Sequence, residues 1–154
     1  MNRFIEECPI YKIRLADHGL TRLSVRDNGS GVAECSVPLM VTSHTTSKIA
    51  DFSDLRALAT YGFRGEALNA LCGLSEVEIE TKRRSDSVGR KFTFDASGGV
   101  KTSAPLAMNP GTTVVAKNIF HNLPVRRNLY KKGNRKKEEL KRVEYFCKAY
   151  GIVR

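Results

Sequence analysis

A short polar segment at residues 27–31, DNGSG, has the residue types best suited to binding a ligand. A carboxylate such as Asp27 at the end of a strand accepts hydrogen bonds from an exocyclic amino group, which adenine offers. Gly29 and Gly31 let the backbone come close to a ligand. Because Asn-Gly between β-rich segments is also the strongest short-range hairpin signal, a plain turn is the alternative. Residues 32–35, VAEC, are too short and polar for a convincing return strand, which weakens that alternative.

A second segment, GFRGEAL at residues 62–68, suits an anion such as phosphate. Its two glycines bracket the point where we expect a loop to become a helix. The first turn of a helix has free N–H groups and the positive end of the helix dipole, and glycine leaves them accessible. An ordinary helix start, in which Glu66 is merely favourable in the first turn, is the alternative.

Two weaker signals accompany these segments. Thr46, Ser47 and Lys48 supply hydroxyls and an ammonium group, a mixture that suits a phosphate or a hydrated Mg²⁺. Thr112 offers a hydroxyl, although its surroundings first indicate a turn and a core strand. The histidines at positions 18, 44 and 121 lack metal-ligand spacing, and no Ser/His/Asp or Cys/His arrangement is evident. The sequence therefore predicts no catalytic residue and no metal ligand.

Alternating and helical apolar patterns predict the elements that position these segments. Six strands are expected, at residues 10–15, 20–26, 77–82, 90–94, 100–105 and 112–117. Helical segments are expected at residues 37–41, 53–58, 65–73 and 135–150, with Pro124 interrupting an irregular stretch. In the last helix we expect Glu138 to pair with Arg142 four residues on. This order predicts an α+β fold with a largely hairpin-built sheet.

Composition narrows the class of protein. The 154 residues are about one domain long, and 41% are hydrophobic, which is too many for a disordered chain. No apolar stretch approaches the length of about 18 residues that a membrane span needs, and the acidic start is unlike a signal peptide. The four cysteines form no CxxC pair, which indicates buried or idle thiols in a reducing compartment.

The net charge of +10 is concentrated in one block. Residues 126–142 hold nine Lys/Arg and two Glu, a charge of +7, whereas the first 125 residues carry only +2. A block of this kind can contact nucleic-acid phosphates, or it can be a solvated helix face.

Four segments in order resemble the MutL family of DNA mismatch-repair proteins: DNGSG, TTSKI, GFRGEAL and GTTVVAKNIFHNLPVRR. DNGSG alone is shared with Hsp90, type II topoisomerases and sensor histidine kinases, whereas GFRGEAL separates MutL homologues from those relatives. The contexts VPLMVTSHTTSKI and NLPVRRNLYKK are most similar to the eukaryotic post-meiotic-segregation branch. The resemblance covers residues 10–154 and leaves residues 1–9 as a non-matching segment.

The resemblance implies roles for particular residues. The carboxylate of Asp27 would contact the adenine amino group, with Asn28, Gly29 and Gly31 forming the pocket and Thr112 supporting the adenine side. The phosphates would be wrapped by the segment Gly62, Phe63, Arg64, Gly65, Glu66, Ala67 and Leu68. A mobile loop over the nucleotide would contain Thr46, Ser47 and Lys48.

The resemblance also implies a fold and a cellular setting. The fold would be the two-layer α/β sandwich of GHKL ATPases, a mixed sheet with helices on one face. The family acts in the nucleus with ATP and Mg²⁺, beside a second MutL homologue, a MutS-type mismatch-recognition complex and DNA, and not at a membrane. The basic residues expected near DNA are Arg126, Arg127, Lys131, Lys132 and Lys136.

The sequence departs from the family pattern at its ends. The family has a leading helix with a Glu that activates water and an Asn four residues on that holds Mg²⁺. Here Glu6 is followed four positions on by Ile10, and Glu7 by Tyr11. The helix and the second, transducer domain with its lysine are therefore expected to be missing, so hydrolysis by this chain alone is not expected. An exposed apolar sheet face and poor stability are a further expectation.

Overall fold

The computed structural model describes residues 11–42, 66–132 and 135–152, with the side chains of the last three left out. Within them lie six strands: β1 (Lys12–Ala16), β2 (Arg22–Arg26), β3 (Glu76–Lys82), β4 (Gly89–Phe94), β5 (Val100–Leu106) and β6 (Gly111–Lys117). The helices are η1 (Asp17–Gly19), η2 (Glu34–Ser36), α1 (Val37–Val41), α2 (Glu66–Leu74), α3 (Pro124–Lys131) and α4 (Arg135–Ile152). The predicted helix at residues 53–58 and the segment before residue 11 lie outside the described residues.

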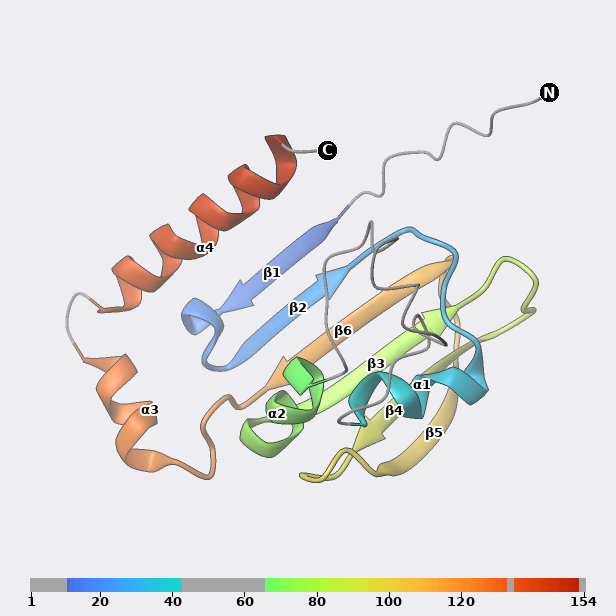
Figure 1. The fold of residues 1–154 in the computed structure, drawn as a ribbon, viewed down its shortest axis with the longest axis horizontal. Helices are drawn as coiled ribbons and strands as arrows, with labels where there is room; N and C mark the ends of the chain where they lie inside the picture. Colours follow the sequence, from blue (N-terminus) through green and yellow to red (C-terminus); the bar gives the residue numbers. More distant parts are fainter. Residues whose placement is uncertain (1–10, 43–65, 133–134, 153–154) are drawn as a thin grey trace, which may run out of the picture.

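The strands form one sheet in the order β1-β2-β6-β3-β4-β5 (Figure 1). All neighbouring pairs among the described strands are antiparallel, so this part of the sheet is more uniform than the mixed sheet that the resemblance implies. The last strand, β6, inserts between β2 and β3. That insertion brings residues 27–31, just after β2, beside the start of β6.

Helices α1 and α2 lie over one face of the sheet, in front of the strands in Figure 1. Alternation in β3 points Val77 and Ile79 to that face, where both are buried against Val37, Val41 and Cys72. Burial of each such aliphatic side chain contributes about 1.5–3 kcal/mol, so this cluster anchors the sheet under α1 and α2. The expected α+β sandwich with helices on one face is confirmed.

The β1 end of the same face is less well covered. Ile13 is 41% exposed, and its neighbours Leu15, Leu23 and Val25 are only partly buried. This edge of the described sheet therefore buries its apolar side chains less completely than the β3 region does.

The structure corrects two local expectations near the C-terminus. Pro124 begins a helix, α3, because proline at the first helical position needs no N–H partner and has a helical φ. In α4, Arg142 pairs with Glu139 at 3.0 Å, three residues away, rather than with Glu138. Leu140 and Val143 of α4 are half-buried, whereas Cys147 is exposed.

The opposite face of the sheet is polar and has a central ion triad. The carboxylate of Glu78 accepts hydrogen bonds from Lys117 Nζ at 2.6 Å and from Lys91 Nζ at 2.9 Å, and its side chain is 13% exposed. Burial pushes the pKa of Glu78 up, but the two ammonium groups outweigh it and lower the pKa below its ordinary value of 4.5. The stability that this carboxylate contributes is therefore present above about pH 4.5 and is lost as pH falls through the lowered pKa.

We expect Glu78→Gln to lower the free energy of unfolding at pH 7 by about 1–3 kcal/mol, since charged hydrogen bonds are lost. The deficit should shrink as the pH falls through the lowered pKa of Glu78, because the wild-type carboxylate then becomes protonated, so pH 7 is compared with a pH below that pKa. Urea unfolding at both pH values measures the difference. Glu76→Gln is the control, because Glu76 is exposed and accepts a single bond from Asn118. An equal Glu78→Gln deficit at both pH values would contradict the assignment.

Candidate functional site

The backbone holds Asp27 at the end of β2. One oxygen, Oδ1, accepts hydrogen bonds from Gly29 N at 2.9 Å and from Thr112 N at 3.2 Å. Asp27 N in turn donates to Thr112 O at 2.9 Å. Among the described residues no hydrogen bond reaches Oδ2. The carboxylate is thus oriented by one oxygen, and the other can accept a hydrogen bond from a ligand.

Two glycines allow the chain segments around Asp27 to meet. Gly31 has a φ of +74°, and a Cβ there would lie 2.1 Å from Lys82 O. Gly111 has a φ of +127°, and its Cβ would lie 2.2 Å from Asp27 O. No side chain fits at either position, because both the backbone conformation and the space exclude a Cβ. The Asp27–Gly31 segment is therefore no simple hairpin turn: it packs on β3 and leads into η2.

Thr112 and Thr81 form a buried hydroxyl pair beneath this segment. Their Oγ1 atoms are 3.2 Å apart, and the residues are 7% and 3% exposed. Thr81 Oγ1 also accepts a hydrogen bond from Val32 N at 2.8 Å. The pair links β3, β6 and the Asp27 segment, which the sequence separates by up to 85 residues.

The sequence interpretation did not select Thr81 or Gly111 as site residues. A signal for Thr81 was available: alternation in β3 places it on the same face as Val77 and Ile79, so a hydroxyl occurs where an apolar side chain is expected. For Gly111 the signal was weaker, because a glycine before a strand is common in ordinary turns.

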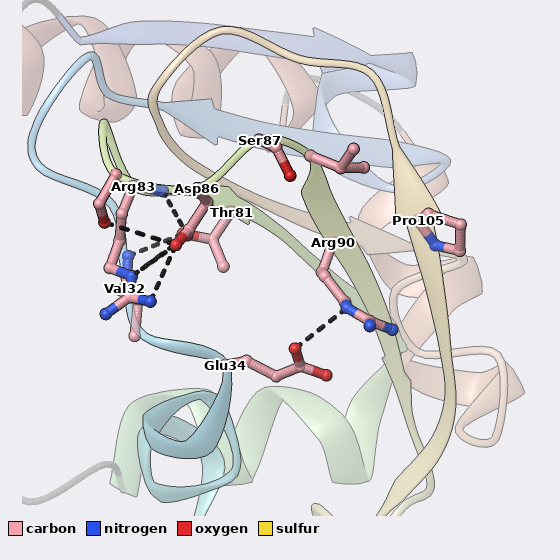
Figure 2. Close-up of a pocket in the computed structure, with 10 residues that line it drawn as sticks. Val32, Glu34, Thr81, Arg83, Asp86, Ser87, Arg90 and Pro105 are labelled. Carbon is pink, nitrogen blue, oxygen red and sulfur yellow. Dashed lines mark hydrogen bonds and ion pairs between the residues drawn. The ribbon is translucent and has the colours of Figure 1, made fainter.

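A polar cavity of about 440 Å³ borders the hydroxyl pair on the side of the β3–β4 connection (Figure 2). Thr81 and Val32 line it together with two ion pairs, Arg83–Asp86 at 2.8 Å and Arg90–Glu34 at 3.0 Å. The Asp86 carboxyl has a pKa below its ordinary value, chiefly because Arg83 donates hydrogen bonds to it. Because Arg83 and Arg90 are already paired with carboxylates, this cavity offers no unpaired arginine to an anion.

The other predicted ligand residues are only partly described. Glu66, Ala67 and Leu68 form the first turn of α2, and Leu68 packs on the core while Glu66 and Ala67 are exposed. Asn28 is exposed beside Asp27. Thr46, Ser47, Lys48 and residues 62–65 lie outside the described residues. The structure therefore brings together Asp27, Gly29, Gly31 and Thr112 and leaves the phosphate-side residues as predictions.

The predicted basic residues have different surroundings. The Arg126 guanidinium lies 5.3 Å from the centre of the Phe120 ring, which also stacks on Tyr130. Arg127 is half-buried, and its Nε has no hydrogen-bond partner among the described residues. Lys136 binds Asp17 at 2.7 Å and, as a hydrogen-bond donor, lowers the pKa of that carboxyl. Arg126, Lys131 and Lys132 are exposed, whereas Arg127 and Lys136 are half-buried.

Neither a metal-binding cluster nor a membrane-spanning helix occurs in the described part of the chain. It contains no group of three or more His, Cys, Asp or Glu side chains placed to hold a metal ion. None of its helices combines the length and apolar character that crossing a membrane requires. Cys35 and Cys147 are exposed free thiols, and burial raises the pKa of the Cys72 thiol.

Comparison with known proteins shows the family to which the chain is related. No family model matches the chain. The chain is 45% identical over 141 residues to chicken "Mismatch repair endonuclease PMS2" and 37% identical over 142 residues to human "PMS1 protein homolog 1". These residues belong to the MutL family. The matches cover 92% of the chain but only 16% and 15% of those relatives.

Solved structures agree with the MutL assignment. The N-terminal domain of a DNA repair protein superposes with a TM-score of 0.75 and 30% identity, over 93% of this chain and 39% of that one. The ATPase domain of Aquifex aeolicus MutL complexed with ADP superposes with a TM-score of 0.53 over 80% of this chain and 41% of that one. At 21% identity this second likeness shows the shared ATPase-domain fold.

Proposed function

We propose that this MutL-type region binds ATP, with the adenine at Asp27. The observation that carries the proposal is the orientation of that carboxylate, in which two backbone N–H groups hold Oδ1 and leave Oδ2 for the adenine amino group. The buried hydroxyls of Thr112 and Thr81 and the glycine backbone lie beside it. The ADP named for the Aquifex aeolicus domain supports the same ligand class.

The phosphates would lie toward the start of α2. We propose that the backbone of residues 62–68 surrounds them, because free helix-start N–H groups favour anions. Mg²⁺ would accompany the phosphates, with the hydroxyls of Thr46 and Ser47 and the ammonium of Lys48 in the loop over the nucleotide.

The setting that we propose is nuclear DNA mismatch repair. The relatives named PMS1 and PMS2 are eukaryotic mismatch-repair proteins. A second MutL homologue would form a heterodimer with the protein, and a MutS-type complex would deliver it to mismatched DNA. ATP binding would drive closure of the dimer.

A second function, DNA contact by the basic residues of α3 and α4, is favoured by their exposure. Lys131 and Lys132 are exposed and form no ion pair among the described residues, although Lys131 is near enough to Asp17 to help lower its pKa, whereas Lys136 binds Asp17 directly. We propose that Arg126, Arg127, Lys131 and Lys132 contact phosphates directly and that Lys136 chiefly fixes α4 against η1.

The nucleotide proposal is tested by the base specificity of ligand-induced stabilisation. Thermal unfolding of the 154-residue chain should shift upward with ATP or ADP and Mg²⁺, by a free energy of about 2.7 kcal/mol at a hundredfold excess over Kd. GTP should give little shift, because guanine presents a carbonyl oxygen where adenine has its amino group and would repel the carboxylate. Equal shifts with ATP and GTP would contradict adenine recognition by Asp27.

A further inference from the structure

The sheet face opposite α1 and α2 carries an unbalanced group of cations on β1 and β2. Antiparallel register places Lys12, Arg14, Arg22 and Arg26 on this face, since their neighbours Ile13, Leu23 and Val25 point to the helical face. All four are exposed, and none has an ion pair within the described residues. We call these four residues the β1–β2 cation patch.

The register sets like charges against each other. Lys12 lies directly opposite Arg26, and Arg22 lies directly opposite Lys117 of β6. Arg14 faces Ser24, between the two pairs, and is diagonal to both Arg22 and Arg26. Directly opposed like charges destabilise an antiparallel sheet, so the arrangement costs stability in the free protein.

The acids on this face do not offset the patch. The carboxylate of Glu78 is already bound by Lys91 and Lys117, and it lies on β3, three strands away from β1. At the far end, Arg26 and Lys82 line an open hollow of about 830 Å³ together with Glu80. The positive potential of β1 and β2 is therefore directed to solvent.

The spacing suits a polyanion with regularly placed charges. Alternate residues of a strand are about 7 Å apart, and adjacent strands are about 5 Å apart, so the four cations form a flat array. A flat array of guanidinium and ammonium groups can neutralise several backbone phosphates at once.

We propose that the β1–β2 cation patch binds the phosphate backbone of duplex DNA. The inference rests on the proposed role in mismatch repair, but it places a DNA contact on a different face from α3 and α4. The ligand would relieve the repulsion between Lys12 and Arg26, which gives bound DNA a stabilising effect on the sheet.

The test compares two four-residue variants with the same change of net charge. The patch variant is Lys12→Gln/Arg14→Gln/Arg22→Gln/Arg26→Gln. The control is Arg83→Gln/Arg84→Gln/Arg90→Gln/Lys101→Gln, four exposed cations that lie outside β1, β2, α3 and α4. Fluorescence anisotropy with a short labelled duplex, between about 50 and 200 mM salt, gives the slope of log Kd against log salt.

The patch variant should lower that slope by about 3–4, since each phosphate contact contributes about 0.9. The control should change it much less. Equal changes in the two variants would mean that only net charge matters and would overturn the proposal. An unchanged slope for the patch variant, with binding lost when Lys131 and Lys132 are replaced, would overturn it in favour of α3.

Three further measurements separate the remaining outcomes. If the patch variant does not melt cooperatively, Arg14→Gln alone should lower the slope by about 1, and no change would overturn the proposal. Wild-type chain that binds polyglutamate but not the duplex would indicate an acidic protein partner and also overturn it. ATP-induced stabilisation should persist in the patch variant, so failure of the DNA proposal is distinguished from failure of the nucleotide site.

Discussion

Asp27→Asn is expected to abolish adenine-nucleotide binding while the chain stays folded. Asparagine keeps a carbonyl oxygen at Oδ1, so the hydrogen bonds from Gly29 N and Thr112 N are retained. Its amide nitrogen replaces Oδ2 and presents hydrogen atoms where the adenine amino group also donates. A carboxylate acceptor becomes a donor that opposes the ligand.

The expected loss in affinity is about 100-fold or more. A hydrogen bond to a charged group is worth about 1.5–3 kcal/mol, and a site left with mismatched polar groups discriminates more strongly than that. Titration calorimetry with ATP and Mg²⁺ measures Kd, and thermal unfolding without nucleotide checks the fold. The melting temperature of the free variant should stay close to that of the wild type.

Asp95→Asn is the matched control for this substitution. Asp95 Oδ1 accepts hydrogen bonds from Ser97 and Gly99 in the β4–β5 turn, an arrangement similar to that of Asp27 but in a different loop. Nucleotide affinity should be unchanged in this variant. Wild-type affinity in Asp27→Asn would rule out adenine recognition by the Asp27 carboxylate.

Much of the fold could be predicted because its signals are local. Alternation predicts β3, since Val77 and Ile79 are buried while Glu76 is exposed. Helix α2 followed from the apolar spacing after residue 65. The start of α3 is harder to predict, because a proline such as Pro124 can interrupt a helix but is also suited to the first helical position.

The assembly of the site could be predicted only through family resemblance. Strand order is a property of long-range pairing, and no local pattern indicates that β6 inserts between β2 and β3. The contacts of Asp27 with Thr112 and of Val32 with Thr81 depend on that insertion. For the same reason Lys136, which belongs to a basic block in the sequence, was expected at DNA although it pairs with Asp17 across 119 residues.

Gly31→Ala is expected to cause a large loss of stability. The φ of +74° is costly for alanine, by about 1–2 kcal/mol. The new Cβ would also lie 2.1 Å from Lys82 O and 2.9 Å from Arg83 N, both backbone atoms of the β3–β4 connection. Because backbone must shift, we expect a total cost of about 3–5 kcal/mol, a large share of the usual stability of a domain.

Gly73→Ala separates this effect from the general consequences of removing a glycine. Gly73 lies in α2, and its added Cβ would meet nothing closer than Ala96 O at 3.7 Å. The change should be neutral or stabilise the chain by up to about 1 kcal/mol, because alanine favours a helix. Urea unfolding of the two variants should therefore give shifts of opposite sign or very different size.

ATP affinity should also distinguish Gly31→Ala from Gly73→Ala. The shift forced on residue 31 moves Val32 N away from Thr81 Oγ1, which it contacts at 2.8 Å, and loosens the hydroxyl pair beneath Asp27. Gly31→Ala chain that still folds, at low temperature or in a stabilising osmolyte, should bind ATP weakly. Gly73→Ala should bind it like the wild type. Full ATP affinity in folded Gly31→Ala would show that the close packing of this segment on β3 is needed for stability and not for the ligand.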